Sequence, residues 1–259
     1  MKRHRQYKKR INKILLIVLI ITATILCSGI VLWFKFDPVH SPVNPETKTE
    51  IVEPAPVVIP VFDKTKHSTT DPNSVWVIAN KQHPLNPIDF EPANLITSPS
   101  GAVVQDVVSN DLESMLSAAL ADGVNITIVS SYRSYYTQSY VYGNYVAQNG
   151  QELTDTFSAR PGFSEHQTGL AIDFGSSTNS SCNFDVCYMT ATEGAWLAAN
   201  ASNYGFLLRY TEEKQYLTGY KAEPWHYRYV GRELMDEMKK QGIVTLEEFF
   251  NVDGGEVYL

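Results

Sequence analysis

Residues 164–175 read SEHQTGLAIDFG, and residues 223–231 read EPWHYRYVG. The first stretch contains His166 and Asp173, and its apolar part predicts a strand at residues 170–174. Side chains alternate along a strand, so Asp173 would face away from the leucine, isoleucine and phenylalanine around it. A carboxylate in an apolar strand needs a cation or several hydrogen-bond donors. Asp173 is therefore either a metal ligand or a carboxylate that protein donors satisfy.

The second stretch predicts a strand at residues 225–230, in which His226 shares a face with an arginine. An isolated histidine in such a strand is more often a hydrogen-bonded core residue than a ligand. From residue 75 onward, however, the chain contains only three histidines, and His166 and His226 both lie near acidic residues. Together with Asp173 they supply two imidazoles and one carboxylate, a set that suits a catalytic zinc site with its fourth position left to water.

Hydrolysis at such a site also needs a carboxylate that moves protons. Zinc lowers the pKa of its bound water to about 7 and polarises a carbonyl. A general base then takes the proton from the water and passes it to the leaving amine. Glu223, three residues before His226, is the candidate base. Glu165, adjacent to His166, is the alternative, although it could instead orient the neighbouring loop.

Both stretches closely resemble the two signatures of bacterial zinc D-alanyl-D-alanine carboxypeptidases of the VanY type and of the related L,D-carboxypeptidases. Residues 130–138 (SSYRSYYTQ) and 76–87 (WVIANKQHPLNP) are similar to the same family, so the resemblance covers about residues 75–240. It implies an α+β domain with a central antiparallel sheet flanked by helices, the fold of D-alanyl-D-alanine peptidases and hedgehog signalling domains.

The resemblance also implies roles for individual residues, with zinc as the cofactor. An arginine suits the substrate site because its guanidinium can neutralise either the terminal carboxylate of a peptide or a developing oxyanion. The matching positions in this chain are His166, Asp173 and His226 for the metal, Glu223 for the catalytic base, and Arg133, Gln138 and Ser164 for the substrate.

The activity that the resemblance implies is hydrolysis of the terminal D-alanine from the stem peptides of peptidoglycan. Three alternatives stay open: an L,D-carboxypeptidase that trims tetrapeptide stems, an endopeptidase that cuts cross-links, and a non-catalytic module that binds the cell wall. A pure binder needs no base beside the metal, so the presence of Glu223 favours an enzyme.

Charge is unevenly distributed along the 259 residues. Residues 1–35 contain eight of the 21 lysines and arginines and none of the 28 aspartates and glutamates, which leaves 13 basic against 28 acidic residues in the rest. Such an acidic body disfavours nucleic acid as a partner, because phosphate binding needs a basic surface.

The N-terminal part predicts a membrane anchor. Residues 14–34 form a run of 21 uncharged positions, long enough for a helix to cross a hydrocarbon core of about 30 Å. Seven basic residues precede the run and one follows it. The positive-inside rule therefore places the basic tail, residues 1–13, in the cytoplasm and the catalytic domain outside, as in a single-pass protein of the cell membrane. A cleaved signal peptide is the alternative.

Residues 35–74 predict a linker. They hold seven of the 13 prolines and no glycine, a composition typical of an extended spacer. The folded domain is then expected at residues 75–259.

Within this domain the sequence alternates between strand and helix patterns. Only two cysteines, Cys182 and Cys187, lie outside the apolar run. Two cysteines are too few for a four-ligand zinc site. In an oxidising compartment, their spacing predicts a small loop closed by a disulfide. Further strands are predicted at residues 75–79, 126–130 and 206–210, and helices at 105–122, 135–149, 232–241 and 245–251, with another that opens at Thr190 and has Glu193 in a capping box.

Overall fold

The computed structural model describes residues 61–259. The predicted anchor at residues 14–34 and the predicted linker up to residue 60 lie outside the described residues. Across the part that is described, no helix is both long enough and apolar enough to cross a membrane. This part combines helices with antiparallel sheets, in agreement with the predicted α+β class.

The strands form two sheets. The larger has four antiparallel strands in the order β3-β4-β6-β5, and the smaller pairs β1 with β2. In the register of the two middle strands, Asp173 lies opposite His226. The strand bounds are Leu95–Thr97 for β1, Val103–Gln105 for β2, Ile126–Ser130 for β3, Ala171–Ser176 for β4, Phe206–Leu208 for β5 and His226–Tyr229 for β6.

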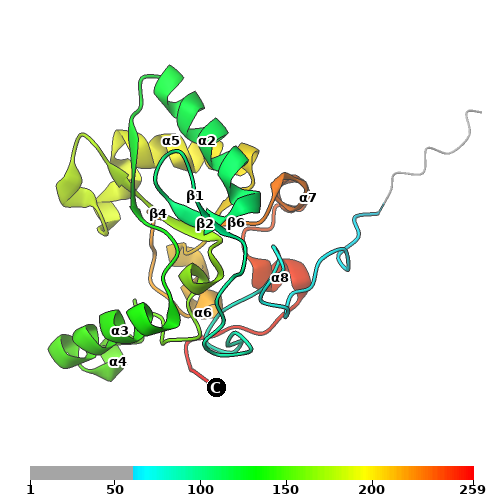
Figure 1. The fold of residues 1–259 in the computed structure, drawn as a ribbon, viewed down its shortest axis with the longest axis vertical. Coiled ribbons are helices and arrows are strands. Elements are labelled where there is room, and N and C mark those ends of the chain that lie inside the picture. Colours follow the sequence, from blue (N-terminus) through cyan, green and yellow to red (C-terminus); the bar gives the residue numbers. More distant parts are fainter. Residues whose placement is uncertain (1–60) are drawn as a thin grey trace, which may run out of the picture. The chain divides into compact units, whose positions relative to one another are not determined.

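Some of the helices pack against the larger sheet, and others extend away from it (Figure 1). The predictions for residues 105–122, 135–149, 232–241 and 245–251 are confirmed to within a residue at each end. The helices are α2 (Asp106–Ala121), α3 (Tyr135–Asn149), α4 (Gln151–Thr154), α5 (Thr192–Asn200), α6 (Gln215–Thr218), α7 (Arg232–Gln241) and α8 (Leu246–Phe250), with short 3-10 turns η1 (Glu165–Thr168), η2 (Ser180–Cys182), η3 (Val186–Thr190), η4 (Ala201–Tyr204) and η5 (Glu212–Lys214).

The main core lies between one face of this sheet and the helices α2 and α5 (Figure 1). Alternation along β4 and β6 sends the apolar and aromatic side chains into this core and leaves Asp173 and His226 on the opposite face. The alternation of apolar and polar residues thus separates the core from the functional face. The core side chains from these elements include Val108, Leu112, Met115, Ala119, Ile172, Phe174, Leu197, Tyr227 and Tyr229.

Two details of the predicted secondary structure are wrong. Residues 75–79 form no strand, although residues 76–79 are buried. The carbonyls of Val75 and Val77 accept hydrogen bonds from the Arg228 guanidinium instead. The capping box at Thr190 is also absent, because α5 begins at Thr192 without a side-chain cap. Glu193 is buried and accepts hydrogen bonds from residues 176–178.

Part of the segment predicted as linker belongs to the folded unit. The Phe62 ring stacks on Trp76 at 5.5 Å and meets Phe249 edge-on at 5.6 Å, measured between ring centroids. These rings join a second apolar cluster built largely from α7, α8 and the buried segment around Trp76. The predicted boundary at residue 75 is therefore too late, because aromatic burial fixes residue 62 on the domain.

Candidate active site

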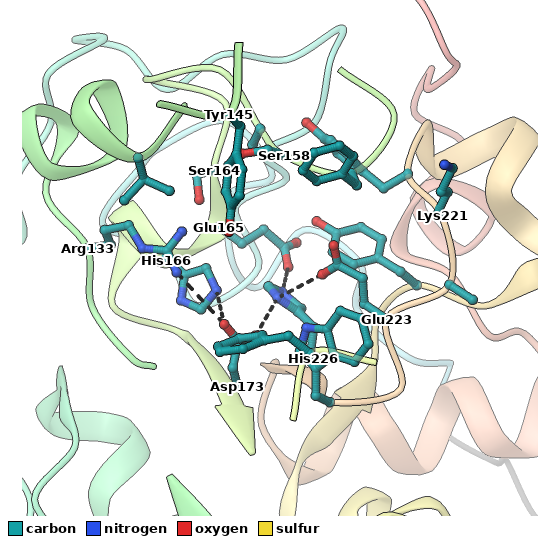
Figure 2. Close-up of a pocket in the computed structure, with 18 of the residues that line it drawn as sticks. Arg133, Tyr145, Ser158, Ser164, Glu165, His166, Asp173, Lys221, Glu223 and His226 are labelled. Carbon is teal, nitrogen blue, oxygen red and sulfur yellow. Dashed lines mark hydrogen bonds and ion pairs between the residues drawn. The ribbon is translucent and has the colours of Figure 1, made fainter. Parts of the chain in front are cut away.

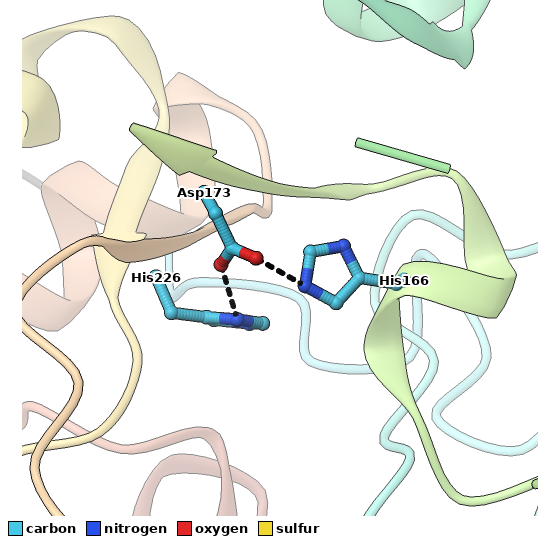
Figure 3. Close-up of side chains that lie close together, drawn as sticks. All are labelled: His166, Asp173 and His226. Atoms are coloured by element: carbon cyan, nitrogen blue, oxygen red, sulfur yellow. Dashed lines mark ion pairs between the residues drawn. The ribbon is translucent and has the colours of Figure 1, made fainter. Parts of the chain in front are cut away.

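Three residues predicted as metal ligands meet on the face of the sheet opposite the main core (Figure 3). Asp173 comes from β4, His226 from β6, and His166 from the 3-10 turn η1 that precedes β4. Asp173 Oδ2 lies 3.1 Å from His166 Nε2, and Asp173 Oδ1 lies 3.1 Å from His226 Nδ1. All three side chains are buried, with exposed fractions of 6% or less.

A left-handed glycine makes this meeting possible. Gly169 has φ +69° and ends η1, so the chain reverses between His166 and the strand that carries Asp173. The His166 carbonyl accepts hydrogen bonds from the backbone N–H groups of Gly169 and Arg133. The turn therefore holds His166 against both β4 and the loop before α3.

The geometry of the three side chains suits a divalent metal. Zinc bonds of about 2.0–2.1 Å in a tetrahedron place ligand atoms roughly 3.3 Å apart, close to the two 3.1 Å separations. Asp173 Oδ1 is buried and has no hydrogen-bond partner, although His226 Nδ1 lies nearby. This is expected if the oxygen and the nitrogen both bind the same cation.

The second nitrogen of each histidine ring is also engaged. His166 Nδ1 lies 2.7 Å from the Ser131 carbonyl oxygen, and His226 Nε2 lies 3.3 Å from Glu165 Oε2. Each of these nitrogens donates to its oxygen in the neutral ring, which leaves His166 Nε2 and His226 Nδ1 with lone pairs for a metal. Such outer contacts commonly orient metal-binding histidines.

Burial and neighbouring charges shift the ionisation of these groups. Burial would raise the pKa of Asp173, but the two histidines outweigh it and hold the pKa below its usual range. Burial lowers the pKa of His166. Burial would also lower the pKa of His226, but its contacts with Asp173 and Glu165 raise that pKa to about 9. A metal must therefore displace a proton from His226 at neutral pH.

Glu223 lies beside the three candidate ligands. Its Oε2 is 3.6 Å from His226 Nδ1, and 15% of its side chain is exposed. Burial raises the pKa of Glu223 to about 8, and the nearby His226 acts in the opposite direction. A bound cation would lower this pKa by Coulomb attraction, towards the range in which a carboxyl group exchanges protons at neutral pH.

Glu165 occupies a different environment from Glu223. Its side chain is fully buried, and Oε1 accepts hydrogen bonds from Arg209 Nε at 2.8 Å and Arg228 Nη1 at 3.0 Å. Burial would raise the pKa of Glu165, but the two arginines hold it well below its usual range. A carboxylate with both oxygens engaged and such a low pKa is a poor proton acceptor, which argues against Glu165 as the base.

The three predicted substrate residues line the same cavity as the candidate metal ligands. Arg133 Nη2 is 3.8 Å from Asp173 Oδ2, and Arg133 Nη1 donates to Gln138 Oε1 at 2.8 Å. Gln138 is buried and donates its amide to the Ala159 carbonyl, so it supports Arg133 from behind. Ser164 immediately precedes η1 and lines the same cavity as Arg133.

These residues surround a cavity with a volume of about 460 Å³ (Figure 2). In this view Arg133 and Glu223 reach the cavity from opposite sides of the two histidines. A disulfide joins Cys182 to Cys187, and the loop that it closes contributes Phe184 to the wall, edge-on to Trp225 at 6.0 Å. Further lining residues are Val141, Tyr145, Phe157, Asp185, Val186, Tyr210, Tyr220 and Lys221.

Some residues that support the site were not found from the sequence. The sequence places Arg228 on the strand face of His226 in the EPWHYRYVG stretch, but no role was predicted for it. Arg209 and Glu247 carry no comparable signal, since they lie outside both motifs. Only the fold brings Arg209 to Glu165 and Glu247 to Arg209.

Comparison with known proteins agrees with this geometry. Residues 101–232 match the family described as VanY, D-alanyl-D-alanine carboxypeptidase. The chain belongs to the VanY family. This match includes all seven residues predicted for the metal, the base and the substrate, whereas α8 lies beyond it.

Individual relatives of this VanY family member have related descriptions. The putative carboxypeptidase YodJ of Bacillus subtilis is 33% identical over 70% of this chain and 68% of its own. The LdcB LD-carboxypeptidase structure superposes with a TM-score of 0.64 at 33% identity, covering 71% of this chain and 89% of LdcB. The D,D-pentapeptidase VanY of a VanB-type resistance cassette, in complex with Zn(II), gives 0.59 at 32% identity, covering 68% and 98%.

Proposed function

We propose that this protein is a zinc-dependent carboxypeptidase that removes the terminal D-alanine from the D-alanyl-D-alanine end of peptidoglycan stem peptides. The single observation that supports this most is the cluster of His166, Asp173 and His226 with Glu223 at its edge, at the base of a cavity that also holds Arg133. Relatives that share the family are described as acting on this substrate class.

The roles of the residues follow from their positions. A zinc ion held by His166, Asp173 and His226 would polarise the scissile carbonyl and acidify a water molecule. Glu223 would accept a proton from the attacking water and deliver it to the leaving amine. Arg133 would pair with the terminal carboxylate of the peptide or with the oxyanion that develops during attack.

Mass spectrometry on a stem pentapeptide tests this proposal. The zinc-loaded full chain should remove one alanine from a peptide that ends in D-alanyl-D-alanine, and a chelator should abolish the reaction. An untouched pentapeptide, with zinc bound and the protein folded, would reject the D,D activity. It would also strengthen the alternative of a non-catalytic module that binds the wall.

An L,D-carboxypeptidase is the second candidate. The structure superposes on LdcB with a TM-score of 0.64, and the chain is 37% identical to a protein described as the L,D-carboxypeptidase DacB in the aligned part. The same mass measurement on a tetrapeptide ending in a single D-alanine separates the candidates. Loss of that alanine, with the pentapeptide untouched, would assign the L,D reaction.

We also propose that residues 14–34 anchor the protein in the cell membrane, with the catalytic domain outside. The support is the run of 21 uncharged residues and the seven basic residues before it. The full chain should sediment with membranes and resist extraction by carbonate at high pH. A mature protein that begins after residue 30 would indicate a cleaved signal peptide instead.

A further inference from the structure

A network of buried charges lies behind the metal ligands and extends to the C-terminal helix α8. Arg209 donates to Glu165 through Nε at 2.8 Å and to both oxygens of Glu247 at 2.6 and 3.0 Å. Arg228 donates to Glu165 at 3.0 Å. Two guanidinium groups therefore face two carboxylates, and all four side chains are buried.

This network ends at a metal ligand. One Glu165 oxygen, Oε1, receives both arginines, while the other, Oε2, lies 3.3 Å from His226 Nε2. Since the arginines occupy Oε1, Oε2 remains for the histidine. The direction of the carboxylate therefore decides which ring nitrogen of His226 donates and which is free to bind the metal.

The rest of the network restrains the carboxylate. Arg228 is fixed by the carbonyls of Val75 and Val77, at 3.0 and 2.8 Å. Glu247 also accepts a hydrogen bond from Asn80 Nδ2 at 3.0 Å, and both of its carboxylate oxygens accept hydrogen bonds from Arg209. A bidentate pair of this kind fixes the guanidinium plane, so Arg209 cannot rotate without losing two hydrogen bonds.

We propose that Arg209 and Glu247 are positioning residues for the metal site, holding Glu165 so that His226 donates through Nε2 and presents Nδ1 to the metal. The proposal rests on the zinc site of the proposed function. It adds that this site depends on α8, outside the part of the chain that matches the family.

Zinc affinity, measured by competition with a chelator and without any peptide, tests the proposal. Removing one partner of a buried ion pair leaves a charge uncompensated and can unfold a protein, whereas apolar replacement of both partners is often tolerated. The test variant is therefore the double substitution Arg209→Met with Glu247→Leu in the full chain. Loss of contacts behind a metal-binding histidine typically weakens metal affinity by about 10- to 100-fold, and we expect that loss here.

Glu193→Gln is the matched control. Glu193 is as buried as Glu165, but it accepts from Ser176, Ser177 and Thr178 and contacts no metal ligand. We expect it to lower the melting temperature without changing zinc affinity. A folded double variant that binds zinc within twofold of the unmodified chain would overturn the proposal, as would an equal loss of affinity in Glu193→Gln.

A second measurement needs no variant. In the zinc-loaded chain with ¹⁵N-labelled histidine, NMR shifts of the ring nitrogens show which nitrogen of His226 binds the metal. Coordination through Nδ1, with a proton on Nε2, is expected, and coordination through Nε2 would overturn the proposal. If the unmodified chain fails to bind zinc at all, the zinc site of the proposed function fails as well. If it binds zinc normally but the double variant does so equally well, only the positioning role fails.

Discussion

At the scale of single residues, environment separates two glutamates, Glu165 next to His166 and Glu223 three residues before His226. Glu165 is buried and paired with two arginines, which keep it ionised. It can therefore accept a hydrogen bond from an N–H group but does not readily exchange a proton. Glu223 is partly exposed to the cavity, and burial raises its pKa to about 8. The same side-chain type is thus suited to positioning in one place and to proton transfer in the other.

Substitution of Glu223 should separate chemistry from metal binding. We expect Glu223→Gln to retain zinc but to lower kcat by about 10²- to 10⁴-fold, because the amide cannot accept the proton. Steady-state kinetics and the zinc content of the purified variant check this. Glu213→Gln, at an exposed position, is the control. Near-normal turnover of Glu223→Gln would show that another group is the base.

Protons should compete with zinc at His226. The pKa of this ring is raised to about 9, so below that pH a proton must leave before Nδ1 can bind a metal. We expect zinc affinity to increase with pH between 7 and 9, by up to about tenfold per unit from this group. Competition with a chelator at several pH values measures the zinc affinity. His67→Gln is the control, because it removes a histidine that is not part of the candidate metal site. An affinity that stays constant over this range would contradict the prediction.

At the scale of elements, the turn between η1 and β4 positions His166 relative to Asp173, two of the candidate metal ligands. Gly169 has φ +69°, and a Cβ there would lie 2.8 Å from Leu95 Cδ2 and 3.3 Å from the Gln105 backbone nitrogen. The Gly169 carbonyl also accepts from that nitrogen at 3.0 Å. The smaller sheet, which contains both Leu95 and Gln105, therefore packs directly against the turn that presents His166.

A side chain at this turn should be costly. We expect Gly169→Ala to reduce the free energy of unfolding by roughly 1–2 kcal/mol, because alanine is strained in the left-handed region. Thermal or urea unfolding of the variant measures this. Gly143→Ala is the control, since Gly143 lies inside α3 with open space around it and should gain about 0.5–1 kcal/mol. Equal stabilities of the two variants would contradict the strain at Gly169.

At the scale of the whole folded unit, residues from the two ends of the described chain pack against each other. Phe62, Trp76 and Phe249 pack together, and the Lys64 ammonium lies 4.1 Å from the centroid of the Phe249 ring. The same region contains Glu247, which reaches the metal site through Arg209. The segment before the family match and the helix after it therefore stabilise each other behind the site.

Truncation of Phe62 should show this contribution. Phe62 is only partly buried, so we expect Phe62→Ala to cost about 1–2 kcal/mol of unfolding free energy, less than a fully buried phenylalanine. The neighbouring substitution Val61→Ala is the control, because Val61 is 92% exposed and should have little effect. Unfolding curves of the two full-length variants check this. A Phe62→Ala chain as stable as the control would place residue 62 outside the cooperative unit.

The sequence by itself determined the family resemblance, the class of fold, most helices and the candidate metal ligands. These features depend on local patterns, such as helical stripes, strand alternation and two compact motifs, whose spacing is fixed by backbone geometry. The same alternation in residues 170–174 predicted that Asp173 would face away from the core, and the structure places it so.

Only the tertiary structure decided which acid could serve as a base and where the domain begins. Glu165 is adjacent to His166 and Glu223 lies three residues before His226, and neither spacing shows which carboxylate is the base. Their difference comes from Arg209 and Arg228, which approach Glu165 from other elements. Residues 75–79 have the composition of a strand but lie where no strand pairs with them. Solvation, charge pairing and strand partners depend on contacts between distant segments, and no local pattern encodes those contacts.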